Sequence, residues 1–288
     1  MFYIGDWDRQ KIISHYIEHN DVDFVLVVYA ERLHQPDYGI PIKHEYIEWH
    51  QTIMYKNYYR LLQRINRRTL IVCDNILVHQ NRYQLEYNCI NNYINQTPQR
   101  IVFNYLPFID GSDDFMILLD FYNKNLYKGE PFRWDYLRDV NLHVKPVHIN
   151  FDFVPIEVTE RDKEQYQKKR DALFDGIGLK DPDTIPRNLA ITAGDIRKQY
   201  MPQDWKYTAR NMRCKSHEMT TYKQDELNVI FDFPTKRIEF IDLLTLSRQT
   251  TVRALTSELS IDQFYKQDYT AWRDRLEAFY DKADVLRG

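Results

Sequence analysis

The run Phe24-Val25-Leu26-Val27-Val28-Tyr29-Ala30 contains no charged side chain. An unbroken apolar run of this length is typical of a strand that is covered on both faces, as strands in parallel sheets are. Leu70–Cys73 (LIVC) is a second run of this kind, and shorter apolar stretches lie at Phe2–Ile4 and Ile101–Phe103. The sequence therefore predicts four buried strands in the first half of the chain.

Segments with helical spacing separate these strands. We expect a helix capped by Asp6 or Asp8 that ends near Asn20, and further helices over residues 45–66, 82–95 and 115–122. Strands that alternate with helices form βαβ units, whose strands run parallel. The predicted class is therefore α/β, with a mainly parallel sheet and flanking helices in the N-terminal half.

The second half of the chain is more mixed. Residues 147–153 alternate between polar and apolar side chains, as in a half-exposed strand, and residues 160–174 indicate a charged helix. Residues 227–233 and 237–243 are predicted to form a β-hairpin, and the chain from Thr250 onward is predicted to be helical, with a break near Ser260. We expect a core over residues 1–125 and a mixed extension over 126–288, although one continuous domain fits equally well.

Composition excludes several classes of protein. The net charge is −3, which argues against a strongly basic nucleic-acid coat protein, and only 8 of 288 residues are glycine. The glycine-rich phosphate loops GxGxxG and GxxxxGK[ST] do not occur, and the three cysteines form no CxxC pair. We also find no signal peptide and no apolar run of about 20 residues, so we expect a cytoplasmic protein, or one of the host cytoplasm if it is viral.

Acidic side chains follow each of the four predicted strands. Carboxyl ends of parallel strands are where ligands bind in open sheets, and carboxylates there can hold Mg²⁺ together with a substrate phosphate. The alternative is that these acids cap the helices that come next. We predict catalytic roles for Asp74 and Asp110, and Mg²⁺ ligation by Asp6, Glu31, Asp113 and Asp114.

Three further residues lie in the loops after the second and third strands. His34 and His79 could act as general acid or base near neutral pH, and Arg32 could contact a phosphate. His15 and His19, one turn apart on the first helix, have a spacing that suits a metal ion, but the sequence shows no third ligand, so we interpret them as a solvated face.

A segment in the second half interleaves basic and aromatic side chains. Arginine and lysine neutralise phosphates, and rings stack on bases, so this composition favours contact with a nucleotide or nucleic acid. Ordinary charged surface is the alternative. The residues that we predict to bind substrate there are Arg197, Lys198, Trp205, Lys206, Tyr207, Arg210 and Arg213.

Three hypotheses of function follow from these patterns. The first is metal-dependent group transfer, of nucleotidyl or glycosyl type, onto a nucleotide or nucleic acid, so that the protein would be a transferase. The second is a metal-dependent nuclease that uses the same acids, with water as the acceptor. The third is a non-catalytic protein, of viral origin for example, that binds nucleic acid or takes part in assembly. The sequence predicts no membrane partner and leaves the oligomeric state open.

Overall fold

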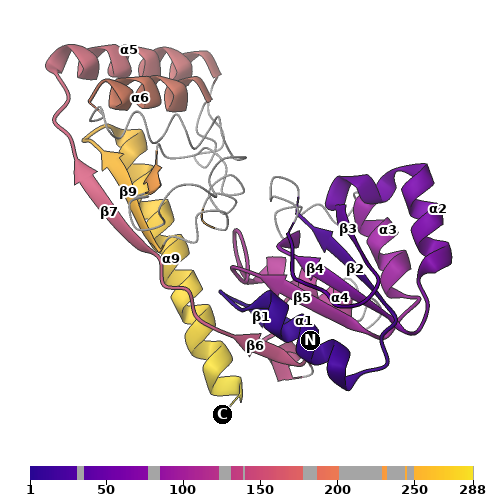
Figure 1. Cartoon of the computed structure of the whole chain (residues 1–288). Helices are drawn as coiled ribbons and strands as arrows, with labels where there is room; N and C mark the ends of the chain where they lie inside the picture. Colours follow the sequence, from indigo (N-terminus) through magenta and orange to yellow (C-terminus); the bar gives the residue numbers. More distant parts are fainter. Residues whose placement is uncertain are drawn as a thin grey trace. The chain divides into compact units, whose positions relative to one another are not determined.

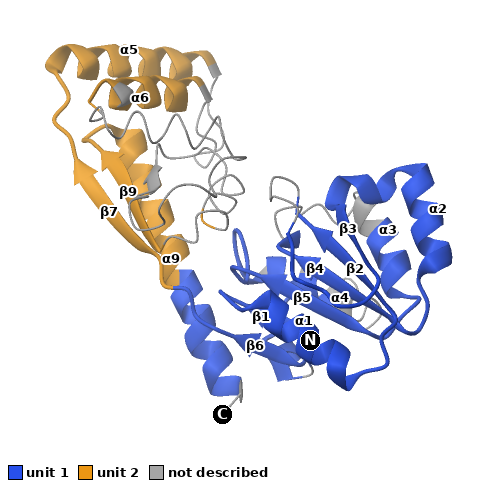
Figure 2. Ribbon diagram, in the orientation of Figure 1, with its two compact units in different colours: residues 1–147, 275–288 blue, residues 148–274 orange. Residues whose placement is uncertain are grey.

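The computed structural model describes residues 1–30, 36–76, 85–122, 131–138, 140–177, 187–200, 229–231, 244 and 250–287. These residues belong to two compact units, one of residues 1–147 with 275–288 and one of residues 148–274 (Figure 2). The predicted boundary after residue 125 falls between the described residues 122 and 131. None of the helices in the described ranges is long and apolar enough to cross a membrane.

The first unit is built around a six-stranded parallel sheet with the strand order β3-β2-β4-β5-β1-β6 (Figure 1). The predicted α/β class, with its parallel sheet and flanking helices, is confirmed. The strands are β1 (Phe2–Ile4), β2 (Phe24–Tyr29), β3 (His44–Glu48), β4 (Thr69–Asp74), β5 (Arg100–Asn104) and β6 (Leu142–Val144).

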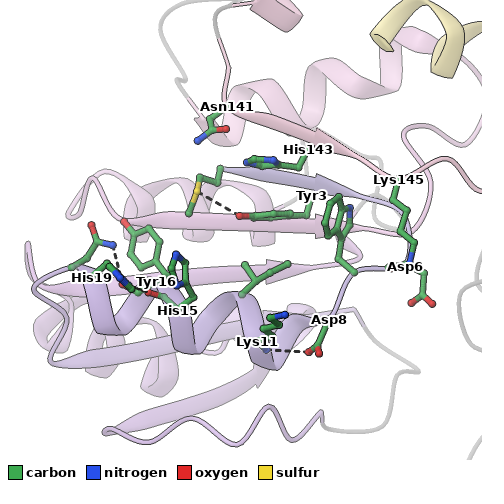
Figure 3. A pocket seen from close by; sticks show the side chains of 14 residues that line it. Tyr3, Asp6, Asp8, Lys11, His15, Tyr16, His19, Asn141, His143 and Lys145 are labelled. Atoms are coloured by element: carbon green, nitrogen blue, oxygen red, sulfur yellow. Dashed lines mark hydrogen bonds between the residues drawn. The ribbon is translucent and has the colours of Figure 1, made fainter. Parts of the chain in front are cut away.

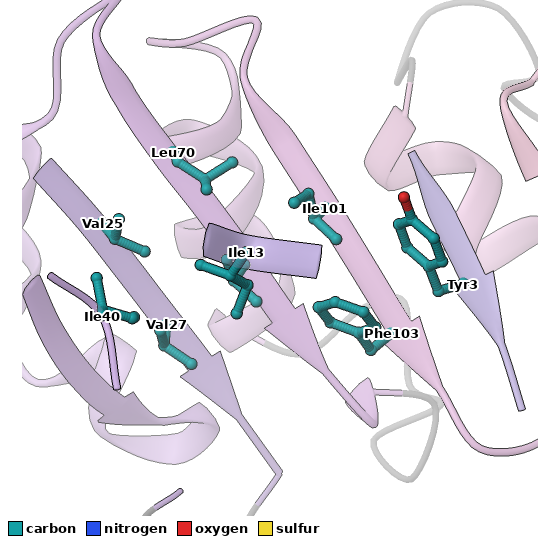
Figure 4. Close-up of a cluster of buried hydrophobic side chains, with 9 residues drawn as sticks. Tyr3, Ile13, Val25, Val27, Ile40, Leu70, Ile101 and Phe103 are labelled. Carbon is teal, nitrogen blue, oxygen red and sulfur yellow. The ribbon is translucent and has the colours of Figure 1, made fainter. Parts of the chain in front are cut away.

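Helix α1 (Arg9–His19) covers one face of this sheet. Its Ile13 is fully buried against side chains that alternate along four strands, because every second residue of a strand points to the same face (Figure 4). The cluster consists of Tyr3, Ile13, Val25, Val27, Ile40, Leu70, Val72, Ile101 and Phe103. Burial of these apolar side chains is the main favourable contribution to the stability of this face.

The opposite face of β1 packs against aromatic rings. Phe2 points away from Tyr3, and its ring centroid lies 6.5 Å from that of Phe115 on α4 (Phe115–Tyr122). Phe115 in turn lies 5.5 Å from Phe279, on the C-terminal part of α9 (Ser260–Arg287). The remaining helices of the unit are the 3-10 helices η1 (Trp49–Ile53), η3 (Ser112–Asp114) and η4 (Trp134–Arg138), together with α2 (Tyr55–Arg64) and α3 (Leu85–Ile94).

The prediction of one helix over residues 45–66 was wrong. These residues form the edge strand β3, then η1, then α2. β3 pairs in parallel with β2 from Val25 to Tyr29, and this pairing buries Ile47. The apolar spacing of this segment fits a helix as well as a strand. Residues 44–48 form a strand because the edge of β2 is there to pair with, and the sequence of the segment does not reveal that edge.

The second unit contains a smaller parallel sheet of order β7-β9-β8. Its strands are β7 (Asn150–Pro155), β8 (Val229–Phe231) and β9 (Thr251–Thr256), and its helices are α5 (Glu160–Ile177), α6 (Arg187–Tyr200) and the first part of α9. The helical prediction from Thr250 was wrong for residues 251–256, because these form the middle strand, which buries Val252 and Ala254. β8 pairs in parallel with β9, and the other half of the predicted hairpin, residues 237–243, lies outside the described residues.

Candidate functional site

The chain leaves β1 through Gly5, and this glycine positions the residues that follow. Its φ is +107°, and an added Cβ would lie 2.0 Å from the carbonyl oxygen of Lys145. Only glycine accepts both the backbone conformation and the close approach. The Gly5 N–H donates to the Asn104 carbonyl at 2.8 Å, and the Trp7 indole donates to the Ile4 carbonyl at 2.9 Å. The turn therefore holds Trp7 against the end of β1.

Asp74 ends β4 and is only 3% exposed. Nη2 of Arg9 donates to one of its carboxylate oxygens at 3.4 Å, and the Tyr38 hydroxyl donates to the other. The Arg9 side chain is also buried, and its guanidinium lies 5.3 Å from the centre of the Phe103 ring. Both oxygens of Asp74 are thus hydrogen-bonded within the protein, and a buried arginine offsets its charge.

The pKa shifts of Arg9 and Tyr38 agree with this arrangement. Burial opposes the charge of Arg9, but the Asp74 carboxylate outweighs that effect, so the pKa of Arg9 lies above its ordinary value. Burial and the negative charge of Asp74 both raise the pKa of Tyr38. Arg9 therefore stays charged and Tyr38 stays protonated, so both remain donors toward Asp74.

Asp6 lies at the same edge of the sheet. Its Oδ1 is 3.9 Å from Nη1 of Arg9, so one arginine links two of the predicted acids, Asp6 and Asp74. The Asp6 side chain is 48% exposed, whereas that of Asp74 is 5% exposed. Of these two acids, Asp6 is the one that solvent can reach, and the predicted Mg²⁺ ligation stays a prediction.

Asp114 closes a turn. Its Oδ2 accepts hydrogen bonds from the backbone N–H groups of Ile109, Asp110 and Gly111 at 3.0, 2.7 and 3.4 Å. Asp8 caps α1 by accepting from the Lys11 N–H at 3.0 Å. The capping alternative therefore describes Asp8, whereas Asp114 is held by the backbone of the turn that precedes it. Asp110 is exposed, and Asp113 belongs to η3.

The other predicted residues fall into two groups. Arg197 and Lys198 lie on α6, and the guanidinium of Arg197 is 3% exposed and pairs with Asp262, so it is engaged inside the second unit rather than at its surface. The remaining predicted residues lie outside the described residues: Glu31, Arg32, His34, His79, Trp205, Lys206, Tyr207, Arg210 and Arg213.

A pocket of about 970 Å³ lies between α1 and the strands β1 and β6 (Figure 3). Its aromatic part is formed by neighbouring strands, because Tyr3 and His143 are paired in register and their rings stack at 4.7 Å with 11° between the planes. Trp7 meets both rings edge-on, at 5.5 and 6.3 Å. The pocket is lined by Met1, Tyr3, Asp6, Trp7, Asp8, Lys11, Ile12, His15, Tyr16, His19, Asn20, Asn141, His143 and Lys145.

The two ends of the pocket differ in chemistry. Lys11, Lys145 and Asp6 lie near the start of α1, and Nζ of Lys145 donates to the Asp6 carbonyl at 2.9 Å. His15 and His19 lie toward the other end of α1 (Figure 3). The pocket therefore offers rings in the middle, the amines of Lys11 and Lys145 with the carboxylates of Asp6 and Asp8 at one end, and imidazoles at the other.

Sequence patterns did not identify this pocket. Tyr3 lies in a segment that we predicted only as a buried strand, and the partner strand β6 comes from residues 142–144, where no strand was predicted. The stacking of Tyr3 on His143 joins residues that are far apart in the chain. Glu18 was also missed, and it stands beside His15 and His19 on the exposed face of α1.

Comparisons with known proteins find only distant structural similarity to this chain. No protein-family model matches the chain, and no curated protein matches it. A solved structure of the Sulfolobus solfataricus SWI2/SNF2 ATPase core in complex with dsDNA has a TM-score of 0.37 and 10% identity, over 100% of this chain and 90% of that chain. The Sulfolobus solfataricus SWI2/SNF2 ATPase core domain also has a TM-score of 0.37 and 10% identity, over 90% of this chain and 72% of that chain. Similarity at this level carries no argument about function.

Proposed function

We propose that the first unit binds a nucleotide in the pocket between α1, β1 and β6, and that the protein transfers a group to or from this nucleotide. The observation that carries the proposal is the combination, in one pocket, of the Tyr3–His143 stack with the amines of Lys11 and Lys145. Rings stack on bases, and amines attract phosphates. A volume of about 970 Å³ is at the upper end for small-molecule sites, which is sufficient for a nucleotide.

The arrangement favours one orientation of the nucleotide. The base would lie against the rings of His143 and Trp7, and the phosphates would lie near Lys11 and Lys145. This end of the pocket is the N-terminal end of α1, where the helix dipole favours negative charge. Hydrophobic and cationic contacts would thus act on opposite parts of the same ligand.

Asp6 connects this pocket with the predicted magnesium chemistry. It lines the pocket and is half-exposed. Mg²⁺ is commonly held by one or two carboxylates and by substrate phosphates, so Asp6 would share the ion with phosphates placed near Lys145. In group transfer the ion would offset charge that builds up on the phosphates. Asp74 would act indirectly, by holding Arg9 in place beside Asp6.

The binding step can be tested by calorimetric titration of the full chain with ATP, with and without Mg²⁺. We expect Lys11→Gln and Lys145→Gln each to weaken binding about tenfold, because each removes one charged contact with phosphate. Lys43→Gln is the matched control, since Lys43 is an exposed lysine of the same unit that does not line the pocket. Equal affinities of all four proteins would rule out this pocket as the nucleotide site.

The reaction is tested separately, by incubating the protein with Mg²⁺, DNA and a nucleoside triphosphate or a nucleotide sugar. Labelled DNA that gains mass indicates transfer, whereas cleavage without any donor indicates the nuclease. Asp6→Asn should abolish transfer while it leaves the melting temperature unchanged, because Asp6 is half-exposed. Unchanged turnover in Asp6→Asn would exclude Asp6 as a metal ligand of the reaction.

A non-catalytic binding protein is the second candidate. It is favoured by one observation, that the carboxylate oxygens of Asp74 are both occupied by Arg9 and Tyr38. In that case the pocket would bind ATP with the same dependence on Lys11 and Lys145, and no donor would yield a product. Binding without turnover therefore separates this candidate from the transferase.

A further inference from the structure

The exposed face of α1 carries three side chains that can ligate metal. His15, Glu18 and His19 are the one such group within the described part of the chain whose ligand atoms all lie within 4.8 Å of one another. The two imidazole rings are 4.2 Å apart, at 45° to each other. We propose that this group, the α1 triad, binds a divalent transition-metal ion such as Zn²⁺ toward the C-terminal end of α1, where His15 and His19 line the pocket. The proposal does not depend on nucleotide binding.

Helix geometry accounts for the gathering of these side chains. Residues three and four apart on a helix lie on the same side, so His15 faces both Glu18 and His19. Two ligand atoms on a tetrahedral zinc ion are about 3.4 Å apart, for bond lengths of about 2.1 Å. The ligand atoms of the three side chains lie within 4.8 Å of one another, and all three side chains are exposed, so rotations about their side-chain bonds can bring these atoms to the spacing that zinc requires.

A hydrogen bond to the backbone holds the ring of His19 in one orientation. Its Nδ1 lies 2.8 Å from the carbonyl oxygen of His15, and a carbonyl oxygen can only accept, so Nδ1 carries the proton. Nε2 is then the ring nitrogen that can ligate a metal ion. Histidines that ligate metals commonly donate their other N–H to a backbone carbonyl in this way, because the bond fixes the tautomer and the orientation of the ring.

The ligand set favours zinc over magnesium. Two imidazole nitrogens and one carboxylate suit Zn²⁺, Co²⁺ or Ni²⁺, whereas Mg²⁺ prefers oxygen ligands and retains water. Three protein ligands leave the fourth tetrahedral position open. Since His15 and His19 line the pocket, a ligand in the pocket that carries an oxygen or nitrogen donor can reach that position. The α1 triad thus makes this end of the pocket suitable for an anionic or donor-bearing group.

The test is calorimetric titration of the full chain with ZnCl₂, together with the absorption spectrum of the Co²⁺ form. We expect His15→Ala and His19→Ala each to lower the zinc affinity at least tenfold, and Glu18→Gln to lower it less. Alanine favours helix, so these variants keep α1 folded. His44→Ala is the matched control, because the Nδ1 atom of His44 also lies 2.8 Å from a backbone carbonyl oxygen but His44 does not belong to the triad.

A second readout separates this site from other histidines. Zn²⁺ bound at the α1 triad should raise the melting temperature of the wild type and of His44→Ala, but not that of the His15→Ala/His19→Ala double variant. The proposal is overturned if the double variant binds Zn²⁺ as tightly as the wild type, or if the wild type binds none. Nucleotide binding by the Lys11→Gln and Lys145→Gln variants is measured without zinc, so failure of one proposal leaves the other unaffected.

Discussion

Nη2 of Arg9, in the first turn of α1, lies 3.4 Å from Oδ1 of Asp74, the last residue of β4, across 65 positions of the chain. This ion pair is buried at the carboxyl edge of the sheet, where open α/β sheets place their ligands. It links the first helix to a central strand, and it brings Asp6 to the same edge.

Removal of Arg9 should destabilise the first unit strongly. Arg9→Met keeps the apolar stem of the side chain but leaves Asp74 buried without its cation, which costs about 3–5 kcal/mol. The double variant Arg9→Met/Asp74→Asn should recover a large part of this loss, because no buried charge then remains uncompensated. Urea unfolding of the wild type, both single variants and the double variant measures the coupling. Additive effects of the two substitutions would show that the pair is not coupled.

Gly5→Ala should destabilise the protein by more than about 2 kcal/mol, because alanine at this positive φ is strained and its Cβ would overlap the Lys145 carbonyl. Gly111→Ala is the matched control, since an added Cβ there meets nothing within 4 Å. Thermal melting compares the two variants, and equal melting temperatures would contradict the assignment of strain to Gly5.

Acidic pH should weaken the ion pairs that join Glu45 on β3 to Arg60 and Arg64 on α2. A hydrogen bond from Arg60 lowers the pKa of Glu45, which also pairs with Arg64 at 3.1 Å. A lowered pKa in the folded state means that the stabilisation is complete above the unfolded pKa of about 4.3 and is lost as the pH falls through the folded value.

The free energy of unfolding of the wild type should therefore exceed that of Glu45→Gln at pH 7, by about 1 kcal/mol or less because the pair is partly exposed. This difference should shrink as the pH falls through the folded-state pKa of Glu45, which lies below its ordinary value. Denaturant titrations at several pH values measure it, and a difference that does not depend on pH would mean that the charge of Glu45 is not involved.

His143→Ala should weaken the binding of ATP by about 1–3 kcal/mol, because it removes one ring of the stack on which the base would lie. Binding of inorganic tripolyphosphate should stay unchanged in this variant, whereas Lys145→Gln should weaken both ligands. Calorimetry with the two ligands checks the orientation that we propose. An equal loss for ATP and tripolyphosphate in His143→Ala would place the base elsewhere.

The parallel sheet could be predicted because apolar runs report burial directly. FVLVVYA and LIVC are buried along their whole length, as β2 and β4. β3 and β9 were missed because their residues fit a helix as well as a strand, and the pairing edges on β2 and β7 decided between the two. Pairing is a contact between distant segments, so no window of the sequence contains it.

In the candidate site, too, some residues could be placed from the sequence, and others were identified only from contacts between distant segments. The sequence alone placed Asp6 and Asp74 at the ends of parallel strands. The end of a strand can be recognised in a short stretch of sequence, and βαβ crossovers follow a general rule of direction. The cation that neutralises them, the ring that stacks on Tyr3 and the carboxylate beside His15 and His19 came from the folded chain. Electrostatic and stacking energies depend on distances of a few ångströms, and folding sets these distances between residues that the linear order keeps apart.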